Sequence, residues 1–427
     1  MPEKSVIAEK RVYNMTPEVK ERIDQIRHGI VPEGYKKTKA GIVPAEWTEY
    51  AIAGCLKRVE RPVEVKSDEM YTQIGIRSHG KGLFYKEPVN GKALGNKSVF
   101  WIEPDCFVLN IVFAWEQAIG KTTQKEVGMI GSHRFPMYQQ INERVDIDYL
   151  ISYLMTKRGK DILEAASPGG AGRNRTLGQD RFMNSKIVLP TLTEQKKIAS
   201  ILTMQDKIIE LEQQKIEEIK KAKRFYFEKM FPKEGQAVPE IRFKGFTNTW
   251  EQRKVQDVAD RFDNLRIPVA ANLRVHGTTP YYGANGIQDY VDGFTHDGEF
   301  VLVAEDGAND LKNYPVKCVN GRIWVNNHAH VLQGKAGIAD NSFLAFAISQ
   351  SDIESLLVGG GRAKLNAETL MSIEFRLPCL QEQYRIGEYL TQLDHLITLH
   401  QRKLEEEKRK KKTLMQLLLT GLVRVNA

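Results

Sequence analysis

Apolar residues recur every three or four positions along two long stretches of the chain. In the stretch that begins at Leu377, steps of 4, 3, 4, 3 and 4 residues join Ile386, Leu390, Leu393, Ile397, His400 and Leu404. The stretch that begins at Leu189 has the same steps, through Ile198, Leu202, Gln205, Ile209, Glu212 and Ile216. Such steps form the seam of a coiled coil, although a single surface helix with one apolar stripe also shows them. Polar Gln205, Glu212 and His400 interrupt the seam, and residues of this kind either fix the register or face a partner.

The two stretches are copies of one another, which favours two long helices that pack together. Residues 189–231 align with residues 377–419 without a gap, and 17 of the 43 positions are identical, so the repeat indicates a duplicated architecture. Each copy opens with Leu-Pro after a β-like run, SKIVLP or IEFRLP. Because Pro lacks an N–H and restricts the residue before it, we expect a strand to end there and a helix to begin.

A fainter repeat precedes each helix. Trp47 and Trp250 correspond, each followed by a short helix-like stretch, and β-rich runs with Gly turns lie further along in both copies. We therefore predict an α/β (α+β) fold with a pseudo-twofold internal repeat, in which two globular domains are separated by two long antiparallel coiled-coil helices. The predicted segments are an N-terminal helical segment (1–30, with a helix over Thr16–Arg27), a first domain (31–188), a first long helix (189–232), a second domain (233–376) and a second long helix (377–427).

Composition narrows the class of protein. A chain of 427 residues is long enough for several domains, and it has no apolar run of the roughly 18–20 residues that span a bilayer. No apolar secretory segment opens the chain, and its four widely spaced cysteines suit buried thiols, so we expect a reducing cytoplasm. The formal net charge of +8 permits a polyanionic partner such as nucleic acid.

The motifs supply no convincing active site. The run AWEQAIGKTT resembles a phosphate loop, but Trp115 stands where that motif requires Gly. His328 and His330 alternate in NNHAHV and could ligate a metal, yet no carboxylate or cysteine cluster accompanies them, which favours packed or hydrogen-bonded histidines. The Gly-rich loops lack a dinucleotide-binding spacing, and no Asn-Pro-Pro-aromatic run of an amino-methyltransferase is present. We predict no catalytic, cofactor-binding or metal-binding residue.

Polar, basic loops flanked by glycine recur in both predicted domains. Arg, Lys, Asn and Gln side chains can match the donor and acceptor groups of base edges, and lysines also bind phosphates. Any one such loop can equally be an ordinary solvated loop, but the recurrence in both copies favours DNA binding. The candidate DNA-binding residues are Arg77, His79, Lys81, Arg173, Asn174, Arg175, Asn285, Lys312, Asn313, Arg322, Asn327, Arg362, Lys364 and Asn366.

With both repeats in view, the chain resembles the specificity subunit of type I restriction–modification systems over nearly its whole length. The resemblance is carried by LPTLTEQKKI and LPCLQEQYRI with their helices, by GYKKTKAGIVPAEW and RFKGFTNTWEQRK, and by the terminal LMQLLLTGLVRV. It implies a bacterial or archaeal protein whose two target-recognition domains each bind one half of a bipartite double-stranded DNA target in the major groove, with helices that set the spacer length. It also implies that the chain is not an enzyme. S-adenosylmethionine, ATP and Mg would then belong to partner subunits, namely two methyltransferase subunits and the restriction and translocase subunits.

Two other interpretations stay open from the residues. A fused restriction and methyltransferase enzyme would contain similar recognition domains, but it would need a methyltransferase motif and a longer chain. A non-catalytic coiled-coil scaffold would explain the helices but not the duplicated basic loops. The charged run RKLEEEKRKKK in the second helix is expected either to dock the methyltransferase subunits or to be a solvated helix face.

Overall fold

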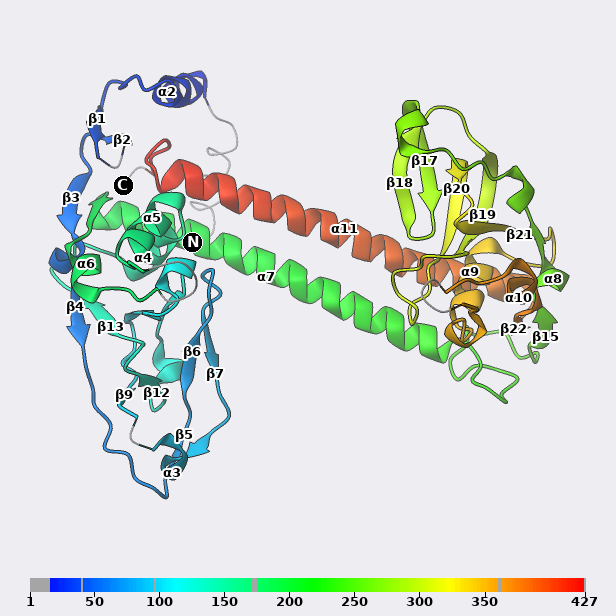
Figure 1. The fold of residues 1–427 in the computed structure, drawn as a ribbon, viewed down its shortest axis with the longest axis horizontal. Helices are drawn as coiled ribbons and strands as arrows, with labels where there is room; N and C mark the ends of the chain where they lie inside the picture. The colour runs from blue at the N-terminus through cyan, green and yellow to red at the C-terminus, as the bar shows by residue number, and fades with distance from the viewer. Residues whose placement is uncertain (1–15, 40, 96, 170–174, 360–362, 426–427) are drawn as a thin grey trace. The chain divides into compact units, whose positions relative to one another are not determined.

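The computed structural model describes residues 16–39, 41–95, 97–169, 175–359 and 363–425 of the chain. The chain divides into two compact units, the first formed by Met1–Leu211 with Leu404–Ala427 and the second by Glu212–Lys403. Helix α7 (Leu192–Lys229) and helix α11 (Leu380–Leu418) each contribute residues to both units (Figure 1). The two long helices expected from the repeat are therefore confirmed. Within the described ranges, no helix is long and apolar enough to cross a membrane.

Within each unit, α7 and α11 pack side by side in opposite directions. In the second unit, Glu212 contacts His400, and further along α7 the Tyr226 ring meets the Tyr389 ring edge to face, with centroids 5.1 Å apart. Residue numbers thus rise along α7 while those of its partners on α11 fall. The first unit shows the same order. Leu202 shares a core with Leu414, and further along α7 Gln205 contacts Glu407, which lies earlier on α11.

One ion pair occurs at equivalent positions in both units. Lys411 Nζ lies 2.5 Å from Asp206 Oδ1 in the first unit, and Lys223 Nζ lies 2.7 Å from Asp394 Oδ1 in the second. The sequence alignment matches Asp206 with Asp394 and Lys223 with Lys411. The pairing of the helices therefore follows the sequence repeat.

The polar residues of the seam contact the other helix of the same chain. Gln205 is fully buried, and its Nε2 donates to Glu407 Oε2 at 2.5 Å. Glu212 accepts from His400 Nδ1 at 2.8 Å and from Lys403 Nζ at 2.5 Å. Because these partners are specific, the polar residues fix the register of the helix pair.

The first unit contains short antiparallel strands and small helices around one main core. Its four-stranded sheet has the order β11-β10-β13-β4, and the core joins this sheet to α4, α5, α6 and the ends of both long helices. The helices are α2 (Pro17–Arg27, after Thr16 as N-cap, as predicted), α3 (Gly91–Leu94), α4 (Ile147–Leu154), α5 (Lys157–Ala165) and α6 (Gln179–Asn184). The strands are β1 (Tyr35–Thr38), β2 (Gly41–Pro44), β3 (Thr48–Ala51), β4 (Leu56–Val59), β5 (Met70–Tyr71), β6 (Ile74–Ile76), β7 (Leu83–Tyr85), β8 (Val89–Asn90), β9 (Val99–Trp101), β10 (Phe107–Leu109), β11 (Ile119–Lys121), β12 (Ile130–Ser132), β13 (Met137–Gln140) and β14 (Lys186–Leu189).

The second unit is built on a six-stranded sheet of order β16-β21-β19-β20-β17-β18. All its neighbouring strands are antiparallel except β17 and β20, which are parallel. The strands are β15 (Glu251–Lys254), β16 (Ala259–Arg261), β17 (His276–Gly283), β18 (Gly286–Val291), β19 (His296–Ala304), β20 (Val316–Val325), β21 (Ala329–Gly334) and β22 (Glu374–Leu377). The helices are α8 (Val255–Val258), α9 (Asn341–Ser349) and α10 (Ala367–Ser372).

A two-stranded ribbon leads into each long helix. β14 pairs with β3, so that Leu189 faces Thr48, and β22 pairs with β15, so that Leu377 faces Glu251. The predicted strand before each Leu-Pro is therefore confirmed. A short helical turn follows each tryptophan, as predicted, but only after a strand, since the residues directly after Trp47 and Trp250 form β3 and β15. Pairing with the strand before the helix decides this local structure.

A buried glutamine in the first turn of α7 binds the first unit. Gln195 Oε1 accepts from the backbone N–H of Asp146 at 2.9 Å, and Gln195 Nε2 donates to the carbonyl oxygens of Arg144 and Pro190 at 2.8 and 2.9 Å. Asp146 is the N-cap of α4, whose Tyr149 N–H it accepts at 2.9 Å. The amide thus satisfies three backbone groups, of which the Pro190 carbonyl is buried.

Gln383 makes the same contacts in the second unit. Its Oε1 accepts from the N–H of Asp340 at 3.0 Å, and its Nε2 donates to the carbonyl oxygens of Ile338 and Pro378 at 3.0 and 2.9 Å. Asp340 is the N-cap of α9. The Glu-Gln pair that opens each helix is therefore a joint between the helix and a neighbouring small helix.

The glutamate of each Glu-Gln pair binds an arginine with both carboxylate oxygens. Arg424 lies 2.7 and 2.9 Å from Glu194, and Arg242 lies 2.8 and 2.7 Å from Glu382. Both carboxylates are almost fully buried. The ion pairs tie the residues that follow each long helix to the first turn of the other.

Candidate nucleic-acid interface

Three of the predicted DNA-binding residues lie on one turn in the first unit. Arg77, His79 and Lys81 are exposed on the turn that joins β6 to β7. The N–H of Arg77 donates to the carbonyl of Gly82 at 3.0 Å and closes the turn. The Arg77 side chain is also held, since its Nη1 donates to the Leu83 carbonyl at 2.8 Å. The turn therefore presents its basic side chains from a fixed backbone.

The same turn binds the short 3₁₀ helix Ala114–Glu116. The N–H of His79, which adopts a left-handed conformation (φ 61°), donates to the Glu116 carbonyl at 2.7 Å. Ser78 Oγ donates to Glu116 Oε2 at 2.8 Å, and the N–H of Gly80 donates to the Gln117 carbonyl at 2.9 Å. These contacts hold the tip of the turn against the helix.

Arg175 reaches the same 3₁₀ helix from another segment. Its guanidinium lies 5.2 Å from the centre of the Trp115 ring, which is a cation–π distance. The structure thus brings Arg175 and the turn 77–82 to one short helix, and we call residues 77–82, 114–117 and 175 the first cluster. Arg173 and Asn174 lie outside the described residues.

In the second unit, four connecting segments meet beside the sheet, and we call them the second cluster. They are residues 283–286, 305–315, 326–328 and 363–366. Asn285 Nδ2 donates to the Gly307 carbonyl at 2.9 Å, and Asn285 Oδ1 accepts from the N–H of Asn309 at 2.8 Å. Asn285 therefore joins two of the segments, and part of its amide is occupied within the protein.

The other two segments join the cluster through residues next to Asp306. His328 Nδ1 lies 2.6 Å from Asp306 Oδ1. The N–H of Leu365 donates to the Glu305 carbonyl at 2.8 Å, and Asp306 and Lys364 form an isolated antiparallel bridge. Residues far apart in the sequence are thereby brought to one surface.

The remaining candidates of the second unit differ in their setting. Lys312 and Asn313 are exposed in a turn whose N–H groups both donate to Asp310 Oδ1 at 3.0 Å. Asn327 is exposed between β20 and β21, and Asn366 is the exposed N-cap of α10. The expected loop position of Arg322 is wrong, because Arg322 lies within β20, where pairing with β19 extends the backbone. Arg362 lies outside the described residues.

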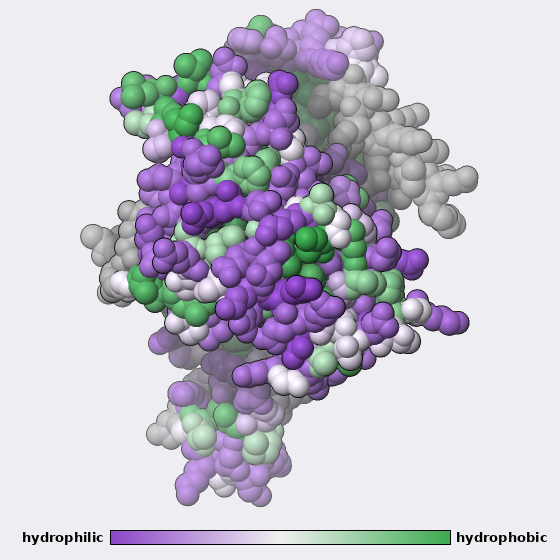
Figure 2. All heavy atoms as spheres, turned by 90° about the vertical axis from the view of Figure 1, so that its right-hand side faces the viewer, coloured by the Kyte–Doolittle hydropathy of each residue, from purple (hydrophilic) through white to green (hydrophobic). Residues whose placement is uncertain are grey.

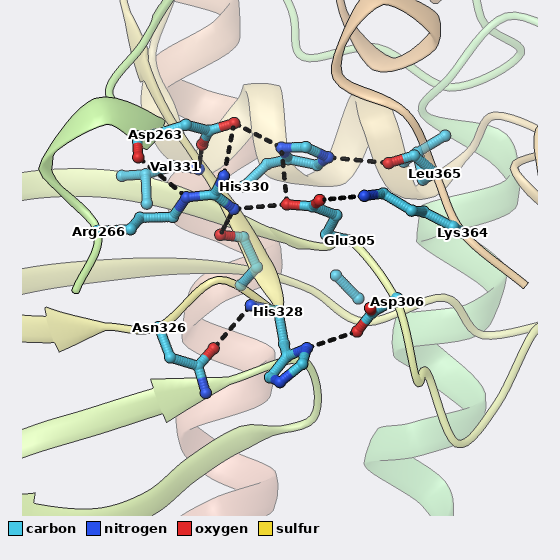
Figure 3. Close-up of polar contacts among 12 residues, drawn as sticks. Asp263, Arg266, Glu305, Asp306, Asn326, His328, His330, Val331, Lys364 and Leu365 are labelled. Atoms are coloured by element: carbon cyan, nitrogen blue, oxygen red, sulfur yellow. Dashed lines mark hydrogen bonds and ion pairs between the residues drawn. The ribbon is translucent and has the colours of Figure 1, made fainter. Parts of the chain in front are cut away.

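A buried charge network lies beneath the second cluster (Figure 3). His330 Nδ1 is 2.6 Å from Asp263 Oδ2, and Arg266 Nη1 is 2.6 Å from Glu305 Oε2. Glu305 Oε1 also binds Lys364 Nζ at 2.8 Å. Asp263, Arg266 and Glu305 were not expected from the sequence, in which the alternation NNHAHV is the one local sign of a polar network here.

The network keeps its carboxylates ionised. Burial raises the pKa of Asp263, but the hydrogen bonds from His330 and from the N–H of Val331 outweigh it and lower the pKa overall. Burial also raises the pKa of Glu305, and the contacts with Lys364 and Arg266 lower it below its ordinary value. The hydrogen bond to Glu305 raises the pKa of Lys364, which stays a cation at the surface.

The two alternating histidines are hydrogen-bonded, as predicted, and bind different carboxylates. In Figure 3, His330 points toward Asp263 and Glu305, whereas His328 points toward Asp306. Among the described residues, no group of three or more His, Cys, Asp or Glu side chains is placed to hold a metal ion. The four cysteines are free thiols, and Cys379 is exposed, so the expectation of buried thiols is wrong at that position.

The surface turned toward the viewer in Figure 2 is mainly hydrophilic. Its apolar residues form several separate areas and no single continuous face. A surface of this kind suits a polar, charged partner better than a large apolar one.

Comparisons with known proteins find the same family in both units. The family model of the type I restriction modification DNA specificity domain matches residues 103–221 and 247–408, well over half of the chain. A protein of Haemophilus influenzae with a provisional assignment as a type I restriction enzyme specificity subunit is 44% identical over 146 residues, which is 34% of this chain and 38% of that protein. The MjaVIII specificity subunit of Methanocaldococcus jannaschii is 23% identical over 433 residues, which is 92% of this chain and 96% of that protein.

Solved structures share the fold. The S subunit of a type I restriction-modification system from M. genitalium superposes with a TM-score of 0.61 at 14% identity, over 87% of this chain and 96% of that one. A chain solved in work on complex assembly and conformational transition of the type I R-M system superposes with a TM-score of 0.50 at 15% identity, over 89% and 99%.

Proposed function

The chain belongs to the type I restriction modification DNA specificity family, and we propose that each of its two domains reads one half of a bipartite DNA target. Membership makes it a DNA-specificity subunit that acts within a restriction–modification complex. We propose residues 31–188 and 233–376 as the two recognition domains, each contacting the major groove.

The observation that carries this proposal is one joint built twice, in two domains that carry different clusters. Gln195 and Gln383 make matching sets of three hydrogen bonds, so both domains are attached to their helices in the same way. The first cluster contains a β-turn against a 3₁₀ helix, whereas the second contains four segments around Asp306. One attachment that presents two different sets of exposed polar side chains suits the reading of two different half-sites.

In the first domain, the chemistry of the first cluster supports DNA contact. Arg77, His79 and Lys81 are exposed donors on a backbone fixed by three hydrogen bonds. Fixed donors lose less freedom on binding than flexible ones, which favours discrimination between base edges. The Arg175 guanidinium over Trp115 offers a further donor of set orientation.

In the second domain, exposed amides and lysines support the same role. We propose Lys312, Asn313, Asn327, Lys364 and Asn366 as contacts from the second cluster, with Asn285 as a residue that shapes it. Arg322 remains a candidate that would act from β20, and its guanidinium is oriented by the Phe294 ring at 4.8 Å. Arginine and lysine contacts to phosphates would make the affinity fall with added salt.

We propose that the long helices set the spacer between the half-sites. The 38 residues of α7 and the 39 residues of α11 correspond to about 57 Å at 1.5 Å per residue. Removing one turn from both helices should shorten the spacer and leave the half-site sequences unchanged. Altered half-site sequences would contradict this role of the helices.

We propose that methylation and cleavage belong to other subunits of the complex. Two methyltransferase subunits that bind S-adenosylmethionine would dock on the exposed faces of the helices, including the charged run of α11. Restriction and translocase subunits would use ATP and Mg. The sequence supports this division, since it offers neither an amino-methyltransferase run nor a phosphate loop.

The test is to map methylated adenines in a methylation-free host that carries this chain and its methyltransferase. We expect one motif with two short specified halves and a fixed unspecified spacer. If no bipartite motif depends on this chain, the proposal is wrong. If the purified complex binds DNA without salt dependence or sequence preference, the scaffold interpretation is favoured instead.

A further inference from the structure

His330 lies between two hydrogen-bond acceptors. Its Nδ1 is 2.6 Å from Asp263 Oδ2, and its Nε2 is 2.9 Å from the backbone carbonyl oxygen of Leu365 (Figure 3). A neutral imidazole carries one N–H and can donate to only one of them, whereas an imidazolium donates to both. The residue is 2% exposed, so bulk water does not replace a missing donor. The two contacts therefore match the two N–H groups of an imidazolium, whereas a neutral ring can donate to only one of the acceptors.

A second buried histidine of the same unit shows the contrast. His296 is also 2% exposed, and its Nε2 lies 3.1 Å from the Phe262 carbonyl oxygen. Its Nδ1 lies 2.7 Å from Thr295 Oγ1, a hydroxyl that can donate. A neutral imidazole satisfies both contacts. Burial lowers the pKa of His296, in agreement with that form.

The charges around His330 come from several segments of the second unit. Asp263 accepts from His330 and is itself 2.8 Å from the Val331 N–H, while Glu305 Oε2 lies 3.7 Å from His330 Nδ1. The charged groups that face His330 or its carboxylate partners are Arg261, Asp263, Arg266, Glu305 and Lys364. Two carboxylates, Asp263 and Glu305, thus lie beside the His330 ring together with the neighbouring cations.

The carbonyl that His330 binds belongs to the segment that carries two proposed DNA contacts. Leu365 is fully buried and lies between Lys364 and Asn366, which are exposed. The N–H of Leu365 donates to the Glu305 carbonyl at 2.8 Å. Leu365 is therefore held on both sides of its backbone, and His330 provides the hydrogen bond to its carbonyl.

We propose that His330 is a positioning residue for DNA reading by the second recognition domain. Its imidazolium fixes Leu365 and thereby places Lys364 and Asn366 against the half-site that this domain reads. The inference rests on the proposed function. Loss of the proton leaves one acceptor without a donor, so the affinity for that half-site falls as the pH rises.

The test uses the full chain co-purified with its methyltransferase subunits. The probes are a duplex with the motif mapped from methylated adenines and two duplexes in which one half-site or the other is scrambled. Affinities are measured between about pH 5 and about pH 8, the range in which histidines change charge. The variants are His330→Gln and, as the matched buried control, His296→Gln.

We expect the wild-type affinity for the intact duplex to fall about tenfold across this range, which equals about 1.4 kcal/mol. His330→Gln keeps one donor and has no proton to lose, so it should bind more weakly at low pH and lose the response. His296→Gln should keep the wild-type response. The duplex whose second-domain half-site is scrambled should show no response, whereas the other scrambled duplex should retain it.

A pH response that survives His330→Gln, or that is equal on both scrambled duplexes, overturns the inference. If His330→Gln does not fold, the wild-type comparison of the two scrambled duplexes decides the matter by itself. Equal affinity of the wild type for the intact duplex and for both scrambled duplexes refutes the proposed function instead. Specific binding without any pH response refutes only the role of His330.

Hydrogen exchange gives a readout that needs no DNA. The amides of residues 363–366 should exchange faster in His330→Gln than in wild type at one low pH, and the difference should shrink at high pH. His296→Gln should leave these amides at the wild-type rate. Equal protection in all three proteins at every pH would contradict the positioning role.

Discussion

Glu212 and His400 occupy equivalent positions in the two copies of the long helix, 188 residues apart, and their side chains meet at 2.8 Å. Two antiparallel copies of one sequence bring equivalent positions together only at the centre of their pairing. The contact therefore defines the register of α7 against α11. Lys403 Nζ, 2.5 Å from Glu212 Oε1, adds a second cation to the same carboxylate.

Replacing Glu212 with Gln should lower the stability of the chain at neutral pH. The hydrogen bond from Lys403, together with that from His400, holds the pKa of Glu212 below its ordinary value of 4.5. Stability from a lowered carboxyl pKa is present above the unfolded value and is lost as the pH falls through the folded value. We expect a loss of roughly 1 kcal/mol at pH 7 that disappears in acid. Thermal unfolding at pH 7 and in acid measures this loss of stability. The control is Glu406→Gln, on the exposed face of α11.

Replacing Gln383 with Leu should destabilise the second domain. The change leaves the Asp340 N–H and the Ile338 and Pro378 carbonyls without their partner. Unsatisfied buried groups cost about 1–3 kcal/mol each, so we expect a loss of roughly 3 kcal/mol in urea unfolding. Gln392→Leu, at an exposed position of the same helix, should cost much less. Equal effects of the two changes would argue against the joint.

Replacing Arg242 with Ala should leave the buried carboxylate of Glu382 without its ion-pair partner. Glu382 is 1% exposed and receives two hydrogen bonds from Arg242. Removing one partner of a buried ion pair costs about 3–5 kcal/mol, and we expect a loss of that order in urea unfolding. Adding Glu382→Gln should recover part of it, because a neutral amide is cheaper to bury than a carboxylate. No recovery in the double variant would show that the packing of Arg242, and not its charge, matters.

Replacing Trp115 with Ala should weaken binding at one half-site only. The change removes the ring beneath Arg175, and a cation–π contact at a partly exposed site contributes about 0.5–1 kcal/mol. For Trp115→Ala we expect a loss of several-fold in affinity for the first-domain half-site. Trp115→Phe should have the wild-type affinity only if an aromatic ring alone is needed at this position. Trp101→Ala, at an exposed indole elsewhere in the same unit, is the control. The measurement is the affinity of each variant for the two duplexes in which one half-site or the other is scrambled.

Replacing Lys364 with Ala should reduce the salt dependence of DNA binding. A lysine that neutralises one phosphate contributes about one unit to the slope of log affinity against log salt. Lys254 is the matched control, because its side chain is 45% exposed and pairs with Glu374, much as Lys364 is 46% exposed and pairs with Glu305. An unchanged slope for Lys364→Ala, or an equal change for Lys254→Ala, would remove Lys364 from the interface.

The sequence by itself determined the elements that depend on local order. The 4-3 spacing around Ile386 and Leu390 predicts α11, because an apolar stripe on a helix needs only residues within a few turns of each other. The Leu-Pro pairs end β14 and β22 for an equally local reason, the missing N–H of proline. The resemblance carried by the repeat then indicated the family.

Only the tertiary structure decided which distant residues meet. Trp115 and Arg175 lie 60 positions apart, and no periodicity relates them, so the first cluster depends on how the turn 77–82 packs. Arg322 was expected on a loop because of its neighbours, but pairing with β19 makes it part of a strand. The contacts of His330 depend on two acceptors, Asp263 and Leu365, brought from opposite sides in the sequence. Hydrogen bonding inside a fold is set by position in space, and the order of residues along the chain does not contain it.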